Sequence, residues 1–336
     1  MVGHRASLAS GLFNGCRREN AIRFFFGMSV ERINAFSAKP SFEAVNRSGD
    51  TSTVECDILL AADGIKSKAR VAMFEDLNIQ TQVKDTGQAA YRIMLRRNQM
   101  ENDPELLKLI DGNSITRWIG ERRHIIAYPI SNNTIYNIST AQPDTNFASA
   151  PSATYTTKGS KPAMLSVFAD FCPKVQRMLD LVPDGAVCEW KLRAHEPLPT
   201  WVHGCVALVG DACHPTLPHL NQGAAQAIED AAVIGAALSR LPDTSPESIN
   251  RALRVYESIR KTRAETIVEL AAASGRTLHL GDGTAKEERD RQFAAAKGGK
   301  GPLPDKWADG DVQAMIFGFD CVKVTHDSFE RIFVSL

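Results

Sequence analysis

The sequence predicts a mixed α/β (α+β) fold, and three patterns support this prediction. The apolar run at residues 206–209 is short, lies between Gly204 and Gly210, and leads through a loop into a helix from about Gly223. Such a strand–loop–helix unit is typical of a buried parallel strand. Residues 71–188 alternate as antiparallel strands do, and the pattern beyond Leu238 is helical. We therefore expect a parallel-sheet part, an antiparallel-sheet part and a C-terminal helical region.

Length and charge restrict the class of protein. A chain of 336 residues allows about two domains. Lys and Arg together number 39, as do Asp and Glu, so no excess charge favours nucleic acid or an anionic membrane surface. No apolar run approaches the roughly 18 residues that span a bilayer, and the first residues lack the apolar core of a signal peptide. We expect a cytoplasmic monomer or homodimer.

The seven cysteines predict neither disulfides nor a metal site. They include no CxxC pair, which is typical of free intracellular thiols. Cys213, His214 and His219 are potential zinc ligands, but their spacing matches no usual zinc site. We therefore expect no metal.

Other elements are predicted along the chain. We expect a short amphipathic helix from the first residues through about Asn14, and a strand within 21–38 that includes Ile22 and residues 24–26. A hairpin is expected at 41–54, a buried strand at 57–62, and further strands at 91–96, 114–120, 124–130 and 134–140. A loop is expected at 141–161, and helices at 168–181 and 246–273. In the last helix, Arg254, Arg260, Lys261 and Arg263 are expected on a solvated face. The charged, glycine-rich residues 281–304 are expected to be mobile.

Asp211 lies at the point where open α/β sheets bind ligands, because it follows the carboxyl end of the strand at 206–209. Gly223 lets a ligand come close to the backbone. The N–H groups of the helix turn that follows favour anionic or oxygen-rich groups. This stretch therefore predicts a ligand site.

The complete spacing of the stretch is more specific. It contains Gly210-Asp211, His214-Pro215, Pro218, Gln222-Gly223-Ala224 and Glu229-Asp230-Ala231. This pattern resembles the second flavin fingerprint of the FAD-dependent aromatic hydroxylases, the single-component flavoprotein monooxygenases of the salicylate hydroxylase type.

Two earlier motifs are similar to other elements of the same family. Asp63-Gly64, followed by Ser67 and Arg70, resembles its Asp-Gly fingerprint, although Asp-Gly alone is a common turn. His4-Arg5 with Leu8 resembles its His-Arg-x-x-Leu helix, whose arginine contacts FAD. The three motifs occur in the family's order.

The resemblance implies an organisation for the whole chain. Residues 1–75 would be a first, shortened segment of a Rossmann-like FAD-binding domain, 76–195 a substrate-binding sheet domain, 196–240 the return segment of the FAD-binding domain, and 241–336 a helical region. Arg5, Asp63, Asp211, Gly223 and Ala224 would contact FAD, and the start of the helix at Gly223 would face the flavin's N1–C2 carbonyl edge. NADH or NADPH and O2 would be co-substrates, and a flavin C4a-hydroperoxide would hydroxylate a small aromatic or phenolic substrate, secondary metabolites included.

Arg92, Tyr128 and His124 are the predicted substrate residues. Arg92 follows Tyr91 in a predicted strand, and its permanent charge would stabilise a phenolate. His124 and Tyr128 are four residues apart, so they face the same side of a strand. In the family, a His-x-x-x-Tyr-Pro arrangement contacts substrate and assists deprotonation. A core histidine beside a core tyrosine is an equal alternative, and for His214 we favour a role in loop structure over catalysis.

The sequence departs from the family at one point. It contains no strand–Gly-x-Gly-x-x-Gly–helix unit, which in this family binds the pyrophosphate. A shortened version of a working hydroxylase is favoured, while a degraded paralogue or a flavin-free binding or assembly protein are alternatives. A flavin epoxidase or reductase of the same fold is the rival enzyme.

Overall fold

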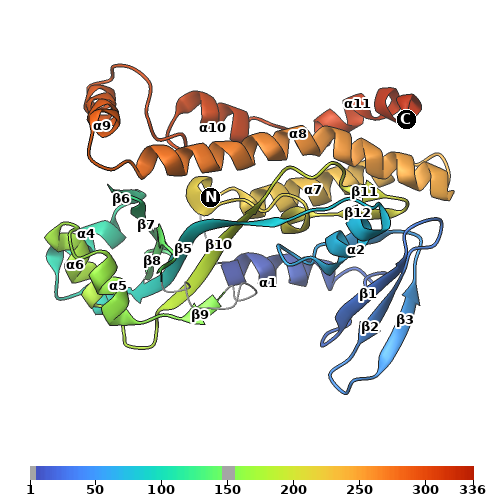
Figure 1. Cartoon of the computed structure of the whole chain (residues 1–336), viewed down its shortest axis with the longest axis horizontal. Coiled ribbons are helices and arrows are strands. Elements are labelled where there is room, and N and C mark those ends of the chain that lie inside the picture. The colour runs from blue at the N-terminus through green and yellow to red at the C-terminus, as the bar shows by residue number, and fades with distance from the viewer. Residues whose placement is uncertain (1–4, 146–155) are drawn as a thin grey trace. The chain divides into compact units, whose positions relative to one another are not determined.

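The computed structural model describes residues 5–145 and 156–336, which form two compact units (Figure 1). The first unit contains the described residues of Met1–Phe24, Asp85–Leu192 and Arg276–Arg291. The second unit contains Phe25–Lys84, Arg193–Gly275 and Gln292–Leu336. Helices and strands occur in both, which confirms the predicted α/β (α+β) class.

The first unit is built on a six-stranded sheet of order β6-β7-β8-β5-β10-β9. Its strands are β5 (Val83–Arg96), β6 (Thr116–Gly120), β7 (Arg123–Ile130), β8 (Ile135–Pro143), β9 (Thr156–Lys158) and β10 (Cys188–His195). The pairs β6–β7, β7–β8 and β5–β8 are antiparallel, as the alternation in the sequence predicts.

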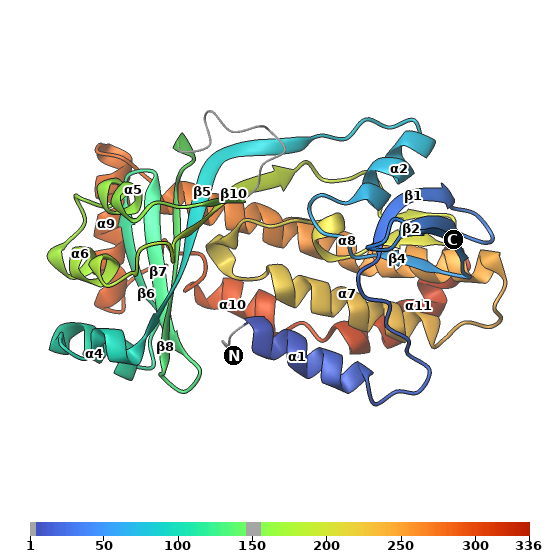
Figure 2. The ribbon, with the colours of Figure 1, turned by 90° about the horizontal axis from the view of Figure 1, so that it is seen from below.

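One face of this sheet is covered by helices (Figure 2). The first unit contains α1 (Arg5–Cys16), α3 (Arg97–Met100), α4 (Pro104–Asp111), α5 (Lys161–Val167) and α6 (Pro173–Asp180). Tyr91, Ile93 and Leu95 alternate along β5 and pack into one apolar core with residues of α4 and α6. The intervening side chains, among them Arg92, therefore lie on the opposite face.

The second unit contains two small sheets. β1 (Ser29–Ala35), β2 (Ser41–Val45) and β3 (Thr51–Glu55) form an antiparallel meander, in which β2 and β3 are the predicted hairpin. The other sheet has the order β11-β12-β4, with β4 at Leu59–Ala61, β11 at Val202–His203 and β12 at Val206–Leu208. β12 is fully buried and parallel to β4, as its short apolar run predicts.

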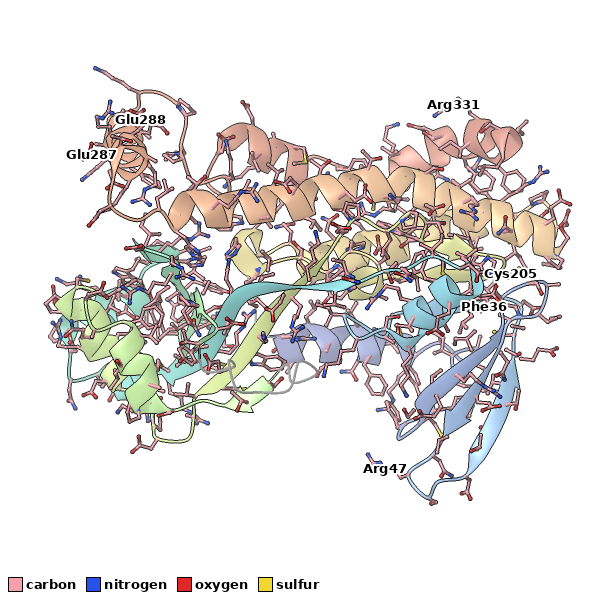
Figure 3. The ribbon with its side chains drawn as sticks, in the orientation of Figure 1. Phe36, Arg47, Cys205, Glu287, Glu288 and Arg331 are labelled. Atoms are coloured by element: carbon pink, nitrogen blue, oxygen red, sulfur yellow. The ribbon has the colours of Figure 1, made fainter. Side chains whose placement is uncertain are left out.

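Gly204 permits a close backbone approach between the two sheets. Its φ is +56°, and a Cβ there would overlap the carbonyl oxygen of Phe36. The next residue, Cys205, donates its N–H to that same oxygen at 2.7 Å (Figure 3). A side chain at position 204 would therefore break the contact that anchors the start of β12.

Helices form the remainder. They are α2 (Lys68–Asp76), α7 (Gly223–Leu238), α8 (Pro246–Leu278), α9 (Thr284–Lys297), α10 (Gly310–Phe317) and α11 (Cys321–Ser335), with 3₁₀ turns at Gly210–Ala212 and Pro218–Leu220. Among the residues described, no helix has both the length and the apolar content needed to cross a membrane.

Several local predictions were wrong. The expected mobile segment 281–304 contains α9, because its alanines and long charged side chains favour a helix and the glycines flank it. The helix expected from residue 168 begins at Pro173, since proline is favoured at a first helical position. β1 lies within the predicted range 21–38, but residues 24–26 precede it. The first helix was expected to be amphipathic, but α1 buries none of its residues.

Candidate functional site

Two acidic residues lie at one edge of the β11-β12-β4 sheet. β4 and β12 run parallel with Leu60 opposite Ala207, so their carboxyl ends are at the same edge. Asp63 follows the end of β4, and Asp211 follows the end of β12. Both side chains are exposed, and Asp63 accepts the N–H of Ala69 at 3.1 Å. This is the edge at which open α/β sheets bind ligands.

Arg70 joins the two loops that extend from this edge. Ser67 caps α2 by accepting the N–H of Arg70 at 2.8 Å, which fixes the start of that helix. The buried Arg70 guanidinium donates to the carbonyl of Ile65 at 2.6 Å and to that of Ala212 at 2.7 Å. The loop after β4 is therefore bonded directly to the loop after β12.

The N-terminus of α7 supplies backbone donors in the second unit. α7 begins at Gly223, and none of the described side chains caps this end. A Cβ at Gly223 would lie 3.2 Å from Cγ2 of Thr216, which is a tight contact, and the neighbouring Ala224 is exposed. Uncapped N–H groups and the partial positive charge of a helix start suit an anionic group or a carbonyl oxygen.

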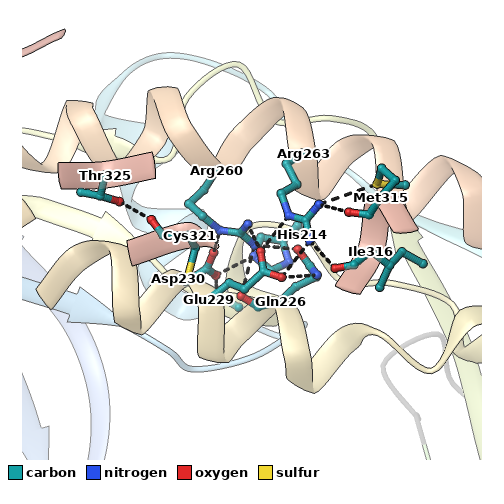
Figure 4. A network of polar contacts seen from close by, with 11 residues as sticks. His214, Gln226, Glu229, Asp230, Arg260, Arg263, Met315, Ile316, Cys321 and Thr325 are labelled. Carbon is teal, nitrogen blue, oxygen red and sulfur yellow. Dashed lines mark hydrogen bonds and ion pairs between the residues drawn. The ribbon is translucent and has the colours of Figure 1, made fainter. Parts of the chain in front are cut away.

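Asp230 of α7 holds the loop after β12 in place (Figure 4). Its carboxylate is fully buried and accepts the N–H of Gly210 at 2.9 Å. It also pairs with Nε2 of His214 at 2.6 Å and with Nε of Arg260 at 2.9 Å. Burial by itself would raise the pKa of Asp230, but His214 and Arg260 more than offset it, so its pKa is lowered.

The network continues through two arginines of α8. Arg260 pairs with Glu229 and donates to Oε1 of Gln226 at 2.6 Å. Arg263 binds the same Glu229 carboxylate at 2.8 and 2.9 Å and also donates to two carbonyls of α10. The prediction that Arg260 lies on a solvated face was wrong, because it is fully buried among these acceptors.

Cys213, His214 and Asp230 place potential ligand atoms within 4.8 Å of one another. Burial raises the pKa of Cys213 well above its ordinary value, which disfavours the thiolate form. The charge of Asp230 is already balanced by Arg260. The geometry thus favours a hydrogen-bonded cluster that fixes the loop, and the expectation of no metal stays a prediction.

The three predicted substrate residues lie on one face of the first unit's sheet. Arg92 is opposite Ser139 on β8, and Ser139 is opposite Ile126 on β7. Directly opposed residues share a face, and β7 alternates, so His124 and Tyr128 lie on the Arg92 face. This is the face away from the α4 and α6 core.

The titratable groups on this face shift one another's pKa values. Arg92 is exposed by its accessible surface, but the atoms packed around its guanidinium desolvate that group and lower its pKa, with Tyr128 opposing this effect and Arg5 adding to it. Burial raises the pKa of Tyr128, and the nearby Arg92 reduces that rise. The first unit thus brings Arg5, Arg92 and Tyr128 within electrostatic reach of one another. Arg5 lies on α1 with an exposed side chain, and His4 lies outside the described residues.

The sequence did not indicate a role for His279, the burial of Arg260 or the contacts of Asp230. Nδ1 of the buried His124 lies 2.7 Å from Nε2 of His279, which follows the end of α8. No spacing in the sequence relates these two histidines, which are 155 positions apart. Asp230 was part of a recognised motif, but its partner Arg260 lies 30 positions further on.

Comparison of the sequence with known proteins shows the family of this chain. The FAD binding domain family matches residues 186–271, which include β12, the loop after it and α7. The FAD-dependent monooxygenase OpS4 of Beauveria bassiana is 32% identical over 323 residues, covering 96% of this chain and 72% of that protein. The chain belongs to the FAD-dependent monooxygenase family. The resemblance to FAD-dependent aromatic hydroxylases is thereby confirmed, and FAD is the cofactor of this family.

Further relatives belong to the same kind of enzyme, and this chain covers different shares of their length. The 3-hydroxybenzoate 6-hydroxylase 2 of Aquipseudomonas alcaligenes is 29% identical over 277 residues, covering 82% of this chain and 78% of that protein. The FAD-dependent monooxygenase atnJ of an Arthrinium species is 36% identical over 251 residues, covering 74% of this chain and 57% of that protein. The chain thus spans little more than half the length of some relatives.

A solved structure shows the same fold. A salicylate hydroxylase substrate complex matches 99% of this chain and 76% of its own, with a TM-score of 0.76 and 24% sequence identity. The chain therefore has the fold of the matched part of that hydroxylase.

Proposed function

We propose that this chain functions as an FAD-dependent monooxygenase that uses NAD(P)H and O2 to hydroxylate a small aromatic or phenolic substrate. The observation on which the proposal rests is the loop pair that Arg70 joins at the common edge of β4 and β12. Family membership supports the monooxygenase activity, and the hydroxybenzoate hydroxylase among the relatives supports an aromatic substrate.

The residues of the second unit fit FAD. The uncapped start of α7 offers N–H donors to the flavin's carbonyl edge, and the exposed Asp211 carboxylate suits ribityl hydroxyls. Gly223 keeps a backbone surface on which a side chain would crowd Thr216. Asp63 is the other proposed contact in this unit, while the FAD contact of Arg5, which belongs to the first unit, stays a prediction. When bound, FAD supplies the chemistry that accepts a hydride from NAD(P)H and activates O2.

The first unit's polar sheet face is the proposed substrate site. The Arg92 guanidinium would bind and orient the phenolate oxygen, because it remains charged at any working pH. Tyr128 lies within electrostatic reach of Arg92 and would hydrogen-bond the same region of the substrate. His124 would accept the phenolic proton.

We also propose roles for the predicted segments. Residues 1–75 and 196–240 would hold the cofactor, 76–195 the substrate, and 241–336 would buttress the cofactor segments. The buttressing role is supported by the ion pair between Arg260 and Asp230.

Cofactor binding is tested by adding FAD to the purified chain. We expect quenching of flavin fluorescence, a shifted visible spectrum and a higher melting temperature. If excess FAD changes none of these, the chain is not a flavoenzyme, and the flavin-free binding protein becomes the better description.

Hydroxylation is tested by measuring NAD(P)H oxidation with candidate phenols and identifying the product by mass. Arg92→Ala should lower kcat/KM by about 10- to 100-fold, because a hydrogen bond to a charged group contributes about 1.5–3 kcal/mol. FAD affinity should change little. Arg96→Ala is the matched control, since Arg96 lies on the same strand and face and, like Arg92, is exposed.

Two results would contradict this assignment. NAD(P)H consumption without an oxygenated product would favour a flavin reductase or another chemistry of the same fold. Equal losses of FAD affinity and turnover in Arg92→Ala would make Arg92 part of the scaffold.

A further inference from the structure

Ser139 lies at the centre of the Arg92 face of the first unit's sheet. It is directly opposite Arg92 on β5 and directly opposite Ile126 on β7. Cβ atoms of directly opposed residues are about 4.5–5.5 Å apart, and diagonal neighbours are within about 8 Å. His124 and Tyr128 lie two positions on either side of Ile126, so both are diagonal neighbours of Ser139. The three predicted substrate residues therefore surround this serine.

The hydroxyl of Ser139 has no hydrogen-bond partner among the residues that the structure describes. Only 6% of Ser139 is exposed. A hydroxyl that is buried to this extent is normally hydrogen-bonded, because an unsatisfied polar group destabilises the folded protein. Ser139 is therefore a polar group on the candidate substrate face that a ligand oxygen would satisfy.

The charges on this face are cations. Arginines lie on it at positions 92, 96 and 117, and the described residues that share it by register in β5 to β8 include no Asp or Glu. In the described parts of the chain, the Arg92 guanidinium forms no ion pair and no hydrogen bond. The side chain directly opposite the Ser139 hydroxyl is thus a cation that has no acidic partner there. Such a pair of donors suits an anionic oxygen.

We propose that the Ser139 hydroxyl donates a hydrogen bond to the same phenolate oxygen that Arg92 binds. This inference rests on the proposed function, because it takes the Arg92 face as the substrate site. The short serine side chain fixes the point at which the oxygen rests, whereas the long arginine can turn its donors over the neighbouring position. A site built in this way rejects an analogue that lacks the oxygen, because its buried donors then remain unpaired.

Calorimetric titration of the full chain with FAD added tests the inference without turnover. The probes are 4-nitrophenol, which ionises readily, and nitrobenzene, which lacks the hydroxyl. We expect the native chain to bind 4-nitrophenol more tightly than nitrobenzene. Ser139→Ala should weaken 4-nitrophenol binding about 10- to 100-fold, because the lost hydrogen bond is to a charged group, and should leave nitrobenzene binding unchanged.

Two further variants separate the hydroxyl from the volume of the side chain. Ser139→Cys keeps a side chain of similar size but offers only a weak donor, so it should lose about as much affinity as Ser139→Ala. Alanine suits this position, since Ala141 is buried on the same face of β8. Ser166→Ala is the matched control, because Ser166 is an exposed serine on α5 of the same unit and should bind both probes normally.

A double-mutant cycle tests whether Ser139 and Arg92 bind one oxygen. If they do, Arg92→Ala/Ser139→Ala should lose much less affinity for 4-nitrophenol than the product of the two single losses. The melting temperature of each variant, measured in the same samples, shows that the chain remains folded.

Three results would overturn the proposal. They are a native chain that does not prefer 4-nitrophenol to nitrobenzene, a Ser139→Ala variant whose losses for the two probes are equal, and single losses that multiply in the double variant. A native chain that selects 4-nitrophenol through Ser139 but hydroxylates no phenol would contradict the proposed function and leave the role of Ser139 intact.

Discussion

Arg70 shows how one side chain contributes to both stability and binding. Its two terminal nitrogens each hold a carbonyl from a different loop, and the whole side chain is buried. A buried carbonyl that loses its donor costs about 1–3 kcal/mol. Loss of the guanidinium would also free the loop that contains Asp211.

Arg70→Ala should therefore lower the free energy of unfolding by about 1–3 kcal/mol and weaken FAD binding. Urea unfolding and a flavin fluorescence titration measure the two effects. Lys68→Ala is the matched control on the same helix, since the ion pair of Lys68 with Glu31 is exposed and should matter little. Native FAD affinity in Arg70→Ala would show that the bridge does not order the binding loop.

For single residues, the sequence predicted which residues lie at strand ends and helix starts better than it predicted which side chains contact one another. Asp63, Asp211 and Gly223 were expected at strand ends and at a helix start, and they lie there because those positions follow local periodicity. The pairing of His124 with His279 depends on how two distant segments fold together, and no local pattern contains that information.

A buried network of charges joins α7 to α8, beside the apolar core to which both helices contribute. The carboxylate of Asp230 accepts from Gly210 and pairs with both His214 and Arg260, with no exposed surface of its own. Removing one partner of a buried ion pair is costly, because the other charge remains without compensation.

Asp230→Asn should lower the free energy of unfolding by about 3–5 kcal/mol, measured by denaturant unfolding. Glu265→Gln on α8 is the matched control, because Glu265 pairs with Lys261 at a partly exposed site and should cost far less. A loss in Asp230→Asn no larger than the control's would mean that the network adds no stability.

Elements with strong periodicity could be predicted from the sequence, and weakly patterned ones could not. The β2–β3 hairpin and strands β5 to β8 were expected because alternation and turn residues define them. α9 was missed because glycines at its ends were interpreted as mobility, when they only flank the helix. The burial of Arg260 was missed because its buried acceptors lie on another helix.

Across the whole molecule, two partly buried histidines, His195 and His279, should make stability depend on pH. Burial, with Arg70 second, lowers the pKa of His195 to about 4, and burial with Arg117 lowers that of His279 to about 4. Both values lie below the roughly 6.5 of an unfolded histidine. Between these values the unfolded chain binds more protons, so stability falls as pH decreases from about 7 towards about 4.

Melting temperature measured at about pH 7 and about pH 5 tests this expectation. The parent chain should melt at a lower temperature at the acidic pH. The double variant His195→Asn/His279→Asn should show a smaller difference, because neither asparagine takes up a proton in this range. An equal difference in parent and double variant would assign the acid sensitivity to other groups.

The buried thiol of Cys213 has a practical consequence. Its high pKa and its position beside Tyr256 protect it from alkylating reagents, while Cys16 and Cys172 are exposed. Cys213 can react only when the loop between β12 and α7 opens, so its labelling rate records the frequency of that opening. Mass spectrometry of peptides containing Cys213 therefore measures how often this loop opens, through the alkylation rate with and without added flavin.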